Sequence, residues 1–343
     1  MRRSRVLPLI TLMTAALLLF MVPAASAQSA SIAQTSGFTP AADACSPAVL
    51  VLSSYPAEIE TVLAAATLDA DQPEVVDGRE FFLGQVEGKR VIMALTGMGM
   101  VNAHNTTSLA FSQFRCDGHS IIHDVVFSGT AGAGAGSAIG DVTVPQQWTS
   151  DFGQTWEHVN PLMFFMAAVA ANTLSGPLAN VVPLGDPLCL CAATAHAGTV
   201  HIDRTPKVII GGSGQTSDSY AGRAFPCVPD GGNLFGCQPC DTGLARLSTV
   251  KASVDDIVPL ASLAVVEANV AETPPESGYV ANDEETASAM AVAEANHTPF
   301  IAFRGISDDN SSDYFAQFAV YQQLAADNAG TLELAFLRVL PAL

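Results

Sequence analysis

The stretch from Asn282 to Asp308, NDEETASAMAVAEANHTPFIAFRGISD, decides how the rest of this chain is interpreted. Its first half is rich in alanine, the best helix former, and the asparagine that opens it is a typical helix N-cap. We therefore predict a helix that runs to about Asn296 and is ended by the segment 297–299 (HTP). The next residues, 300–303 (FIAF), form a short apolar run that is typical of a buried strand.

Charged side chains lie at both ends of this helix–strand unit. Asp283, Glu284 and Glu285 open the helix, and Arg304 and Asp308 leave the strand. Open α/β sheets bind ligands at the carboxyl ends of their strands, so these residues are candidates for one site. A purely structural interpretation competes with this one. Positions 282 and 285 have the spacing of a capping box, and acids in a first helical turn suit the helix dipole.

Length and composition indicate a globular protein with a sizeable core. The chain has 343 residues, of which 49% are hydrophobic and 14% are charged. This length suits one large α/β domain or two small ones. Strand-like and helix-like segments alternate along the chain without an internal repeat, which favours a single α/β domain over residues 45–343.

Residues 1–27 have the composition of a secretion signal. A basic start and an apolar centre are followed by Ala25-Ser26-Ala27, a cleavage-site pattern. A retained membrane anchor is the alternative, because the apolar run approaches the length that spans a membrane. We expect cleavage, a flexible leader over 28–44, and a secreted or periplasmic protein without a stable membrane anchor.

The net charge excludes several classes of partner. The formal charge is −19, and loss of the three arginines in the signal would make it about −22. A strongly acidic surface repels nucleic acid and anionic membranes, so we expect no nucleic-acid partner.

All seven cysteines follow the leader: Cys45, Cys116, Cys189, Cys191, Cys227, Cys237 and Cys240. In an exported protein, structural disulfides are the expected state. Cys237 and Cys240 also have a spacing found in zinc and redox sites, which stays an alternative. The odd number leaves at least one thiol outside the intramolecular pairs. The last three cysteines indicate a disulfide-stapled insertion at about 221–245.

Apolar runs and turn residues predict the remaining elements. The predicted strands cover 48–53, 80–86, 90–95, 124–127, 139–145 and 206–212. The predicted helices cover 58–68, 102–114, 162–173 and, as one helix or a pair, 314–340. The strands 80–86 and 90–95 form a hairpin around Glu87-Gly88-Lys89, whereas 260–270 fits a helix or a strand equally well.

A glycine-rich segment, Ser128–Gly136 (SGTAGAGAG), follows the predicted strand 124–127. It contains neither a G-x-G-x-x-G motif that opens a helix nor the lysine of a P-loop. Dinucleotide and ATP binding are therefore not indicated. The glycines are either a flexible loop or a place where the backbone approaches a ligand closely.

Six segments, taken together and in order, resemble the nucleoside phosphorylase/hydrolase superfamily. They are SSYPAEIE, GREFFLGQVEGKRVIMALTGMGMVNA, SGTAGAGAGSAIGDVTVPQQW, RTPKVIIGGSGQTSDSY, DEETASA and TPFIAFRGISD, and they span most of residues 48–309. The chain looks most like methylthioadenosine/S-adenosylhomocysteine nucleosidases and their secreted plant bark-storage relatives. This resemblance implies a three-layer α/β/α fold with a central mixed sheet. It also implies a small purine nucleoside as the ligand, no metal or other cofactor, and a homo-oligomer, with a dimer favoured.

The resemblance assigns roles to particular residues. Asp308 matches the acid that protonates N7 of the purine, and Glu285 matches the carboxylate that binds the ribose hydroxyls. Glu58 matches the acid that positions or deprotonates the attacking water, and Arg304 matches the arginine of the water site. Substrate contacts are further expected from Thr130 and Gly132 on the ribose side, Met98 beside the sugar, Tyr220 on the purine ring, and Asp283.

The implied chemistry needs these residue types. Cleavage of an N-glycosidic bond develops positive charge on the ribose and negative charge on the base. A protonated acid at the base and carboxylates around the sugar stabilise both. Members of the superfamily that use phosphate carry arginines before the glycine-rich loop and in the first strand–helix turn. Here those places hold Phe127-Ser128 and Ser54-Tyr55-Pro56, so a phosphate dianion would lack charge-assisted donors.

We therefore expect hydrolysis of methylthioadenosine, S-adenosylhomocysteine, adenosine or inosine, with phosphorolysis as the alternative. One departure concerns Glu284, which stands where the family has methionine and lies near the sugar or points outward. It motivates a second alternative, a non-catalytic nucleoside-binding or storage protein. A third, a disulfide-rich surface interaction protein, depends on the cysteine insertion alone.

Overall fold

The computed structural model describes residues 45–70, 72–184, 198–225 and 278–341, all of which belong to one compact unit, Ala41–Leu343. The predicted signal, the leader and segment 260–270 lie outside the described residues, as does most of the predicted insertion at 221–245. Within the described ranges, no helix combines the length and the apolar character that crossing a membrane requires.

The centre of the fold is a mixed sheet built on β8 (Ile122–Ala133). Parallel neighbours flank β8 on both sides, β1 (Ala48–Ser53) on one and β17 (Phe300–Asp308) on the other. The strand β5 (Lys89–Leu95) continues the parallel set beyond β1. Because β1, β5, β8 and β17 run in the same direction, their carboxyl ends meet at one edge of the sheet, where a site is expected.

The remaining described strands extend this sheet or form short ribbons. They are β2 (Thr67–Leu68), β3 (Glu74–Val76), β4 (Arg79–Val86), β6 (Arg115–Cys116), β7 (His119–Ser120), β9 (Val142–Val144), β10 (Gln147–Thr149), β11 (Glu157–His158), β12 (Val181–Pro183), β13 (Thr199–His201), β14 (Val208–Ile210), β15 (Ser213–Thr216) and β16 (Ala281–Asp283). The predicted hairpin is confirmed, since β4 and β5 pair antiparallel around Glu87 and Gly88.

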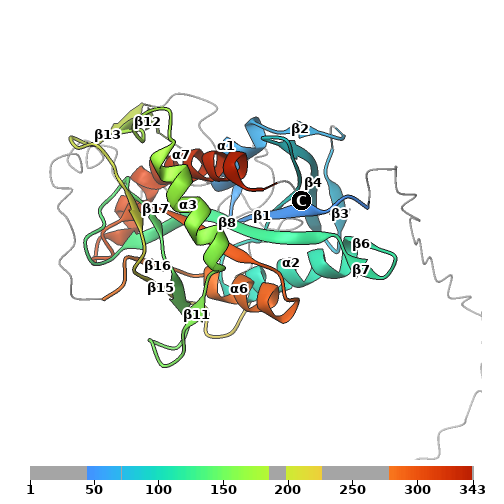
Figure 1. Cartoon of the computed structure of the whole chain (residues 1–343). Coiled ribbons are helices and arrows are strands. Elements are labelled where there is room, and N and C mark those ends of the chain that lie inside the picture. Colours follow the sequence, from blue (N-terminus) through green and yellow to red (C-terminus); the bar gives the residue numbers. More distant parts are fainter. Residues whose placement is uncertain (1–44, 71, 185–197, 226–277, 342–343) are drawn as a thin grey trace, which may run out of the picture. The chain divides into compact units, whose positions relative to one another are not determined.

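Helices cover both faces of the sheet. The helices of the described residues are α1 (Pro56–Ala64), α2 (Met100–Gln113), α3 (Pro161–Asn172), α6 (Thr286–Ala295) and α7 (Tyr314–Val339). Alternate residues of β1 point to opposite faces: Leu50 and Leu52 pack in the core with α2 and α6, whereas Val49 and Val51 pack with α1, α3 and α7. Figure 1 shows α2 and α6 on one side of β1 and β8, and α1 and α7 on the other. The predicted three-layer α/β/α fold with a central mixed sheet is therefore confirmed.

Two strands are longer than predicted, and those predicted at 139–145 and 206–212 are shorter, at Val142–Val144 and Val208–Ile210. The glycine-rich segment is not a loop over its whole length, because β8 continues through it to Ala133. The strand predicted to end at Phe303 continues to Asp308. The two extensions have one cause, since β17 pairs with β8 from Phe300–Val125 to Asp308–Gly132. Pairing with a long-range neighbour overrides the turn propensity of glycine and serine.

The predicted helix 282–296 begins later than expected. Residues 281–283 form β16, which pairs with β15, and the helix α6 starts at Thr286. The capping-box interpretation is wrong, because the Asn282 side chain accepts a hydrogen bond from Ser217 and Glu285 makes no cap bond. The end was predicted correctly: α6 stops at Ala295, and His297 adopts a left-handed conformation with φ of 56°.

One disulfide is present in the described part of the chain, between Cys45 and Cys116. It ties Cys45, three residues before the first residue of β1, to the end of β6. The other five cysteines, including the Cys237/Cys240 pair, lie outside the described residues.

Glu333 in α7 has a buried carboxyl group that is not paired with a cation in the described structure. Its side chain is fully buried, and neither of its oxygens makes a hydrogen bond within the described structure. Burial raises its pKa to about 8, and the neighbouring Ser128 hydroxyl offsets only part of this rise. The folded protein therefore holds a proton that the unfolded chain releases near its ordinary carboxyl pKa of 4.5.

Because the folded protein keeps this proton, we expect its stability to fall as the pH rises from about 4.5 to about 8. The folded state binds more protons across that window, so the free energy of unfolding falls with rising pH. Glu333→Gln removes this dependence and should raise the free energy of unfolding by roughly 1–4 kcal/mol at pH 8 and by little at pH 5. Urea unfolding at both pH values checks this. The exposed Glu294→Gln on α6 is the control, and equal pH dependence in all three proteins would contradict the expectation.

Candidate active site

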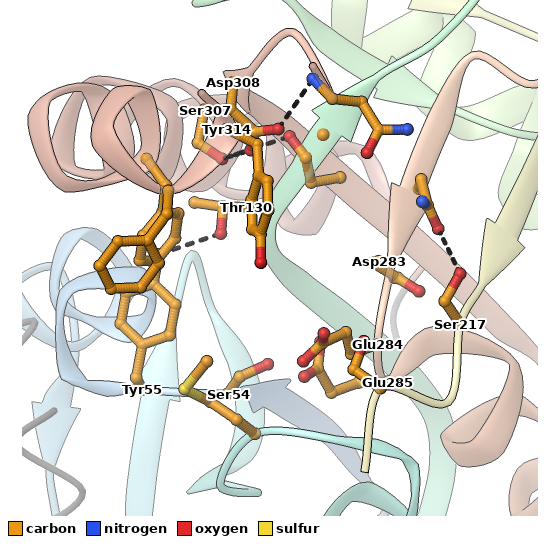
Figure 2. A pocket seen from close by; sticks show the side chains of 18 of the residues that line it. Ser54, Tyr55, Thr130, Ser217, Asp283, Glu284, Glu285, Ser307, Asp308 and Tyr314 are labelled. Carbon is orange, nitrogen blue, oxygen red and sulfur yellow. Dashed lines mark hydrogen bonds between the residues drawn. The ribbon is translucent and has the colours of Figure 1, made fainter. Parts of the chain in front are cut away.

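A cavity of about 390 Å³ opens at the carboxyl ends of the parallel strands. It is lined by loops, strand ends and helix ends from six parts of the chain, 54–58, 98, 130–132, 217–225, 282–285 and 307–318 (Figure 2). Eight of the nine residues predicted from the sequence to form the site line this cavity: Glu58, Met98, Thr130, Gly132, Tyr220, Asp283, Glu285 and Asp308. The ninth, Arg304, lies behind the wall.

Hydrogen bonds from two separate parts of the chain hold Glu58 in place. The strand β1 ends at Ser53, and Pro56 begins α1, so Glu58 falls in the first turn of a helix that starts at the sheet edge. Its Oε2 accepts a hydrogen bond from the Ser54 N–H at 2.6 Å, and its Oε1 accepts from the Thr130 N–H at 2.7 Å and the Thr130 hydroxyl at 3.0 Å. Three donors of this kind stabilise a carboxylate.

The environment of Glu58 pushes its pKa in opposite directions. Burial raises the pKa above its usual range, and the Arg304 guanidinium and the Thr130 and Ser54 donors offset part of the rise. Compensation of the α1 dipole alone does not account for hydrogen bonds to a strand 72 residues away. These bonds fix the Glu58 carboxyl group at the cavity wall.

Glu285 reaches the same cavity from the start of α6. Its Oε1 accepts a hydrogen bond from the Gly99 N–H at 2.7 Å, which joins α6 to the turn that follows β5. The side chain is buried, and its pKa is raised, first by that burial and then by the nearby carboxylates Asp283, Glu284 and Glu58. The Arg304 guanidinium acts in the opposite direction.

Asp308 ends β17 and lies on the other side of the cavity from Glu284 and Glu285 (Figure 2). Its Oδ2 accepts a hydrogen bond from the Ser307 hydroxyl at 2.9 Å, and its Oδ1 accepts from the Asn310 N–H at 3.0 Å. Burial raises its pKa to about 6, Asp309 adds to the rise, and the two donors oppose it. A carboxyl group with this pKa is partly protonated near neutral pH and can donate a proton.

Arg304 differs from the expectation that it enters the site itself. It lies in the middle of β17, is fully buried and is absent from the cavity wall. Its Nε is 2.8 Å from Asp283 Oδ2, and its terminal nitrogen is 3.8 Å from Glu285 Oε2. The guanidinium also stacks 4.4 Å above the Phe127 ring. From this place Arg304 holds the acids of the wall rather than a substrate, so it is a positioning residue.

Two glycines of β8 let the acids approach the backbone. A side chain at Gly129 would have its first carbon 2.6 Å from both Arg304 and Glu58 Oε1. One at Gly132 would be 2.9 Å from Asp308 Oδ1. Glycine is therefore needed at these two positions because carboxylates and a guanidinium group pack onto the strand backbone. Of the two interpretations of the glycine-rich segment, close approach to the backbone is the one that applies here.

Sequence reasoning missed a set of residues that complete the wall or support it. Thr286 connects the acids: its hydroxyl hydrogen-bonds Asp283 and accepts from Arg304 Nε at 3.0 Å. An aromatic group at the start of α7, Tyr314, Phe315 and Phe318, also lines the cavity. The long α7 pattern was recognised, but no local signal tells which end of a helix faces a pocket. Thr286 could have been found from its place beside Glu285.

Within the ranges that the structure describes, no group of three or more histidine, cysteine, aspartate or glutamate side chains is arranged to hold a metal ion. The candidate site is therefore described by its acids, their hydrogen-bond donors and the rings around them.

Comparisons with known proteins agree with this fold. The family model of the Phosphorylase superfamily matches residues 48–201. An uncharacterized protein of Mycobacterium tuberculosis is 44% identical over 204 residues, which cover 60% of this chain and 81% of that protein. A 5'-methylthioadenosine/S-adenosylhomocysteine nucleosidase of Listeria innocua is 29% identical over 109 residues, 30% of this chain and 44% of the enzyme.

Solved structures give the same answer. The 5'-methylthioadenosine/S-adenosylhomocysteine nucleosidase of Neisseria meningitidis, in complex with methylthio-immucillin-A, matches with a TM-score of 0.55 and 17% identity, covering 86% of this chain and all of that one. Futalosine hydrolase of Helicobacter pylori matches with a TM-score of 0.54 and 16% identity, covering 85% and 98%. At these identities the likeness concerns the fold. Together with the sequence matches, it shows that this chain belongs to the phosphorylase superfamily, and its fold is of the methylthioadenosine/S-adenosylhomocysteine nucleosidase type.

Proposed function

We propose that this protein is a purine nucleosidase that hydrolyses the N-glycosidic bond of a nucleoside to free base and sugar. The observation that carries the proposal is one cavity lined by Glu58, Glu285 and Asp308. Burial raises the pKa of both Glu58 and Asp308, the latter to about 6, but Arg304 and three hydrogen-bond donors favour the charged form of Glu58, whereas no cation pairs with Asp308 among the described residues. A site with one positioned base and one available acid suits bond cleavage with proton transfer at both ends.

In the proposed reaction, the purine lies on the Asp308 side and the sugar lies beside Glu285. The bond between C1′ and the purine nitrogen breaks, and its electron pair moves into the ring. Asp308 supplies a proton to N7, so the leaving base is neutral. The Glu285 carboxylate accepts hydrogen bonds from ribose hydroxyls and stabilises the positive charge that develops on the sugar.

Water completes the reaction at C1′. Its oxygen forms the new bond to carbon, and its proton passes to Glu58, whose oxygens already face the Thr130 and Ser54 donors. Arg304, through Asp283 and Thr286, holds the wall that carries Glu285. Preorganised groups of this kind lower the barrier because they need no rearrangement during the reaction.

Hydrolysis is favoured over phosphorolysis by the charge of the wall. The described lining residues include acids at five positions and no lysine, arginine or histidine. A phosphate dianion would enter beside several carboxylates without a charge-assisted donor. The turn Ser54-Tyr55 and the strand segment Phe127-Ser128 hold no basic residue either.

The test is chromatography of a nucleoside panel incubated with the purified protein, with and without phosphate. We expect free purine and a reducing sugar in phosphate-free buffer. Release that requires phosphate and yields a sugar 1-phosphate would establish phosphorolysis instead. Tight nucleoside binding without release over hours would favour a binding or storage protein.

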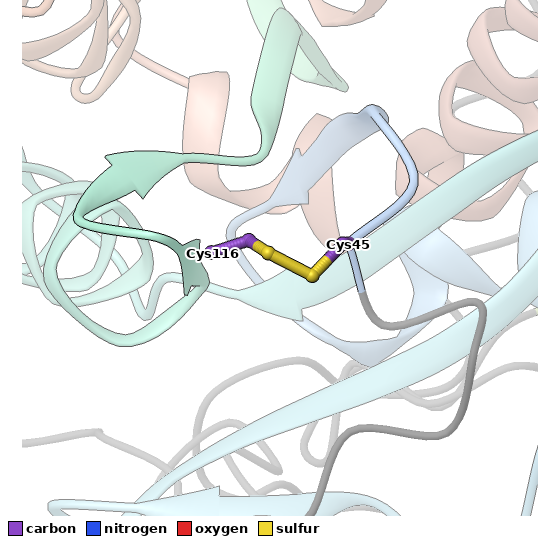
Figure 3. Close-up of a disulfide and its surroundings, with 2 residues drawn as sticks. All are labelled: Cys45 and Cys116. Carbon is purple, nitrogen blue, oxygen red and sulfur yellow. A yellow bond between two sulfur atoms is a disulfide. The ribbon is translucent and has the colours of Figure 1, made fainter.

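We also propose that the protein acts outside the cytoplasm, after loss of residues 1–27. The support is the signal-like composition of that segment and the Cys45–Cys116 disulfide (Figure 3), because such bonds persist in oxidising compartments. The mass and N-terminal sequence of the protein recovered from the culture fluid or periplasm test this proposal.

The same disulfide should contribute strongly to stability. It closes a loop with a sequence separation of 71 residues, and cross-links over loops of this length stabilise a protein by about 4 kcal/mol. Replacing Cys45 and Cys116 together by serine should lower the free energy of unfolding by that order, measured in urea without reductant. Adding reductant to the double variant serves as the control, since any further loss then comes from other cysteines. A double variant as stable as the parent would contradict the prediction.

A further inference from the structure

Glu284 is an acid of the cavity wall that the proposed chemistry does not use. It lies between β16 and α6, is half-buried, and lines the cavity rather than pointing away from it. Figure 2 shows its carboxyl group beside that of Glu285 and across the cavity from Asp308. Under the proposed function, Glu285 binds the sugar and Asp308 the base, so Glu284 lies on the sugar side.

One oxygen of Glu284 is fixed and the other is open. Its Oε2 accepts a hydrogen bond from the Tyr220 hydroxyl at 2.7 Å. Its Oε1 has no hydrogen-bond partner among the described residues. The carboxyl group is therefore oriented by the protein and still has an acceptor to offer a ligand.

Tyr220, which orients this carboxyl group, is itself held firmly. Its ring packs against Phe225 with centroids 4.9 Å apart. The ring also lies close to Gly99, where a side-chain carbon would be 2.6 Å from Tyr220 Cδ2. Its backbone N–H donates to Asp218 Oδ1 at 3.2 Å. The pair Tyr220–Glu284 is thus built into the wall.

No cation balances the charge of Glu284 in the described structure. Arg304 forms ion pairs with Asp283 and Glu285, and no ion pair to Glu284 is formed by any described lysine, arginine or histidine. The wall around it contains four more acids: Glu58, Asp283, Glu285 and Asp308. A ligand group that reaches Glu284 therefore meets a carboxyl group that has an open acceptor and no counter-ion among the described residues.

We propose that Glu284 is a specificity-determining residue that binds a hydrogen-bond donor on the sugar portion of the substrate and favours a positively charged donor. This inference is based on the proposed function, because that function places the sugar beside Glu284. Neutral nucleosides bind Glu284 through a hydroxyl group, and nucleosides that carry an ammonium group bind more tightly. Nucleotides bind most weakly, because their phosphate group is negatively charged. A hydroxyl and an ammonium group both donate a hydrogen bond to the carboxylate, but only the ammonium group adds the attraction between opposite charges, which makes the charge of the substituent the selected property.

The test measures equilibrium binding by calorimetry at pH 7 in an Asp308→Asn background, so that no ligand is consumed. The ligands are adenosine, the three analogues in which an amino group replaces the 2′, 3′ or 5′ hydroxyl, and adenosine 5′-monophosphate. We expect at least one aminonucleoside to bind roughly 10- to 100-fold more tightly than adenosine, and the monophosphate to bind most weakly.

Matched variants assign the preference to Glu284. Glu284→Gln keeps the shape and removes the charge, so it should abolish the preference for ammonium. Tyr220→Phe keeps the ring but frees Oε2, and should reduce the preference. Glu294→Gln removes the same charge from the exposed end of α6, the helix that follows Glu284, and should leave the preference unchanged.

Failure of this inference can be distinguished from failure of the proposed function. Equal binding of adenosine and all three aminonucleosides, or a preference that survives Glu284→Gln, overturns the role of Glu284 even if the parent protein releases purine. A preference for ammonium that depends on Glu284 supports that role even if the parent protein releases no purine, in which case only hydrolysis is refuted. Absence of binding for every ligand overturns both.

Discussion

Asp308→Asn is expected to reduce purine release by about 10²–10⁴-fold, because a positioned proton donor contributes a factor of that order to a reaction rate. Asparagine keeps the size of the side chain, and its oxygen can accept the Asn310 N–H while its NH2 group donates to the Ser307 hydroxyl, but it has no acidic proton to give to N7. Initial rates with a nucleoside in excess measure the loss. The substitution should leave stability nearly unchanged at low pH, which separates a lost proton from a lost fold.

The pH dependence of the reaction tests the role of Asp308 independently. Burial raises the pKa of Asp308 to about 6, so the protonated form persists to higher pH than for an ordinary aspartate. The value of kcat/KM should fall as the pH rises above about 6, since the acid is then lost from the free enzyme. This descending limb should disappear in Asp308→Asn. Ser307→Ala provides a comparison. It removes a donor to the Asp308 carboxylate, so the pKa of Asp308 should rise and the descending limb of the profile should move to higher pH. An unchanged profile in either variant would contradict the assignment.

Arg304→Met should lower the free energy of unfolding by about 3–5 kcal/mol, the usual cost of removing one partner from a buried ion pair. Methionine fills similar space beside Phe127 but leaves Asp283 and Glu285 without their cation. Thr286 and Thr130 also lose a donor. Urea unfolding measures the change.

The destabilisation should grow with pH. The Arg304 charge lowers the pKa of both Glu58 and Glu285, so its loss raises both values in the folded state. Acids whose folded pKa is raised destabilise the protein as the pH rises above the ordinary carboxyl range, and they do so less at pH 5 than at pH 8. Arg338→Met is the control, because Arg338 on α7 forms an exposed pair with Glu87 that is worth at most about 1 kcal/mol. A similar small loss in both variants would show that Arg304 does not compensate the buried acids. If Arg304→Met does not accumulate, Arg304→Lys keeps the charge and should give an intermediate loss.

Much of the fold could be predicted from periodicity and end signals. The buried strand at Ala48, the hairpin around Gly88 and the helix beginning near Pro161 each have a local cause: an apolar run, a two-residue turn, or an asparagine cap. The end of α6 was predicted for the same reason. These features depend on residues that are close together in the chain.

The errors have the opposite origin. Asn282 has the chemistry of a cap but lies in a strand, because the pairing of β16 with β15 outweighs its local preference. The strand before the glycine-rich segment was predicted to end at Phe127, because nothing nearby shows that β17 runs alongside the segment. Arg304 was expected at the rim, since a strand of four residues would have ended there, whereas the longer β17 keeps it buried.

By itself, the sequence determined the elements, their order and the residue types available for chemistry, since these follow from local patterns and from the order of six segments along the chain. Only the tertiary structure decided which acids share a cavity and which of them are paired with Arg304. It also decided that Glu284 faces inward with one open oxygen. The physical reason is distance along the chain. A hydrogen bond between Glu58 and Thr130, or between Gly99 and Glu285, depends on how strands are paired, and no local propensity records that pairing.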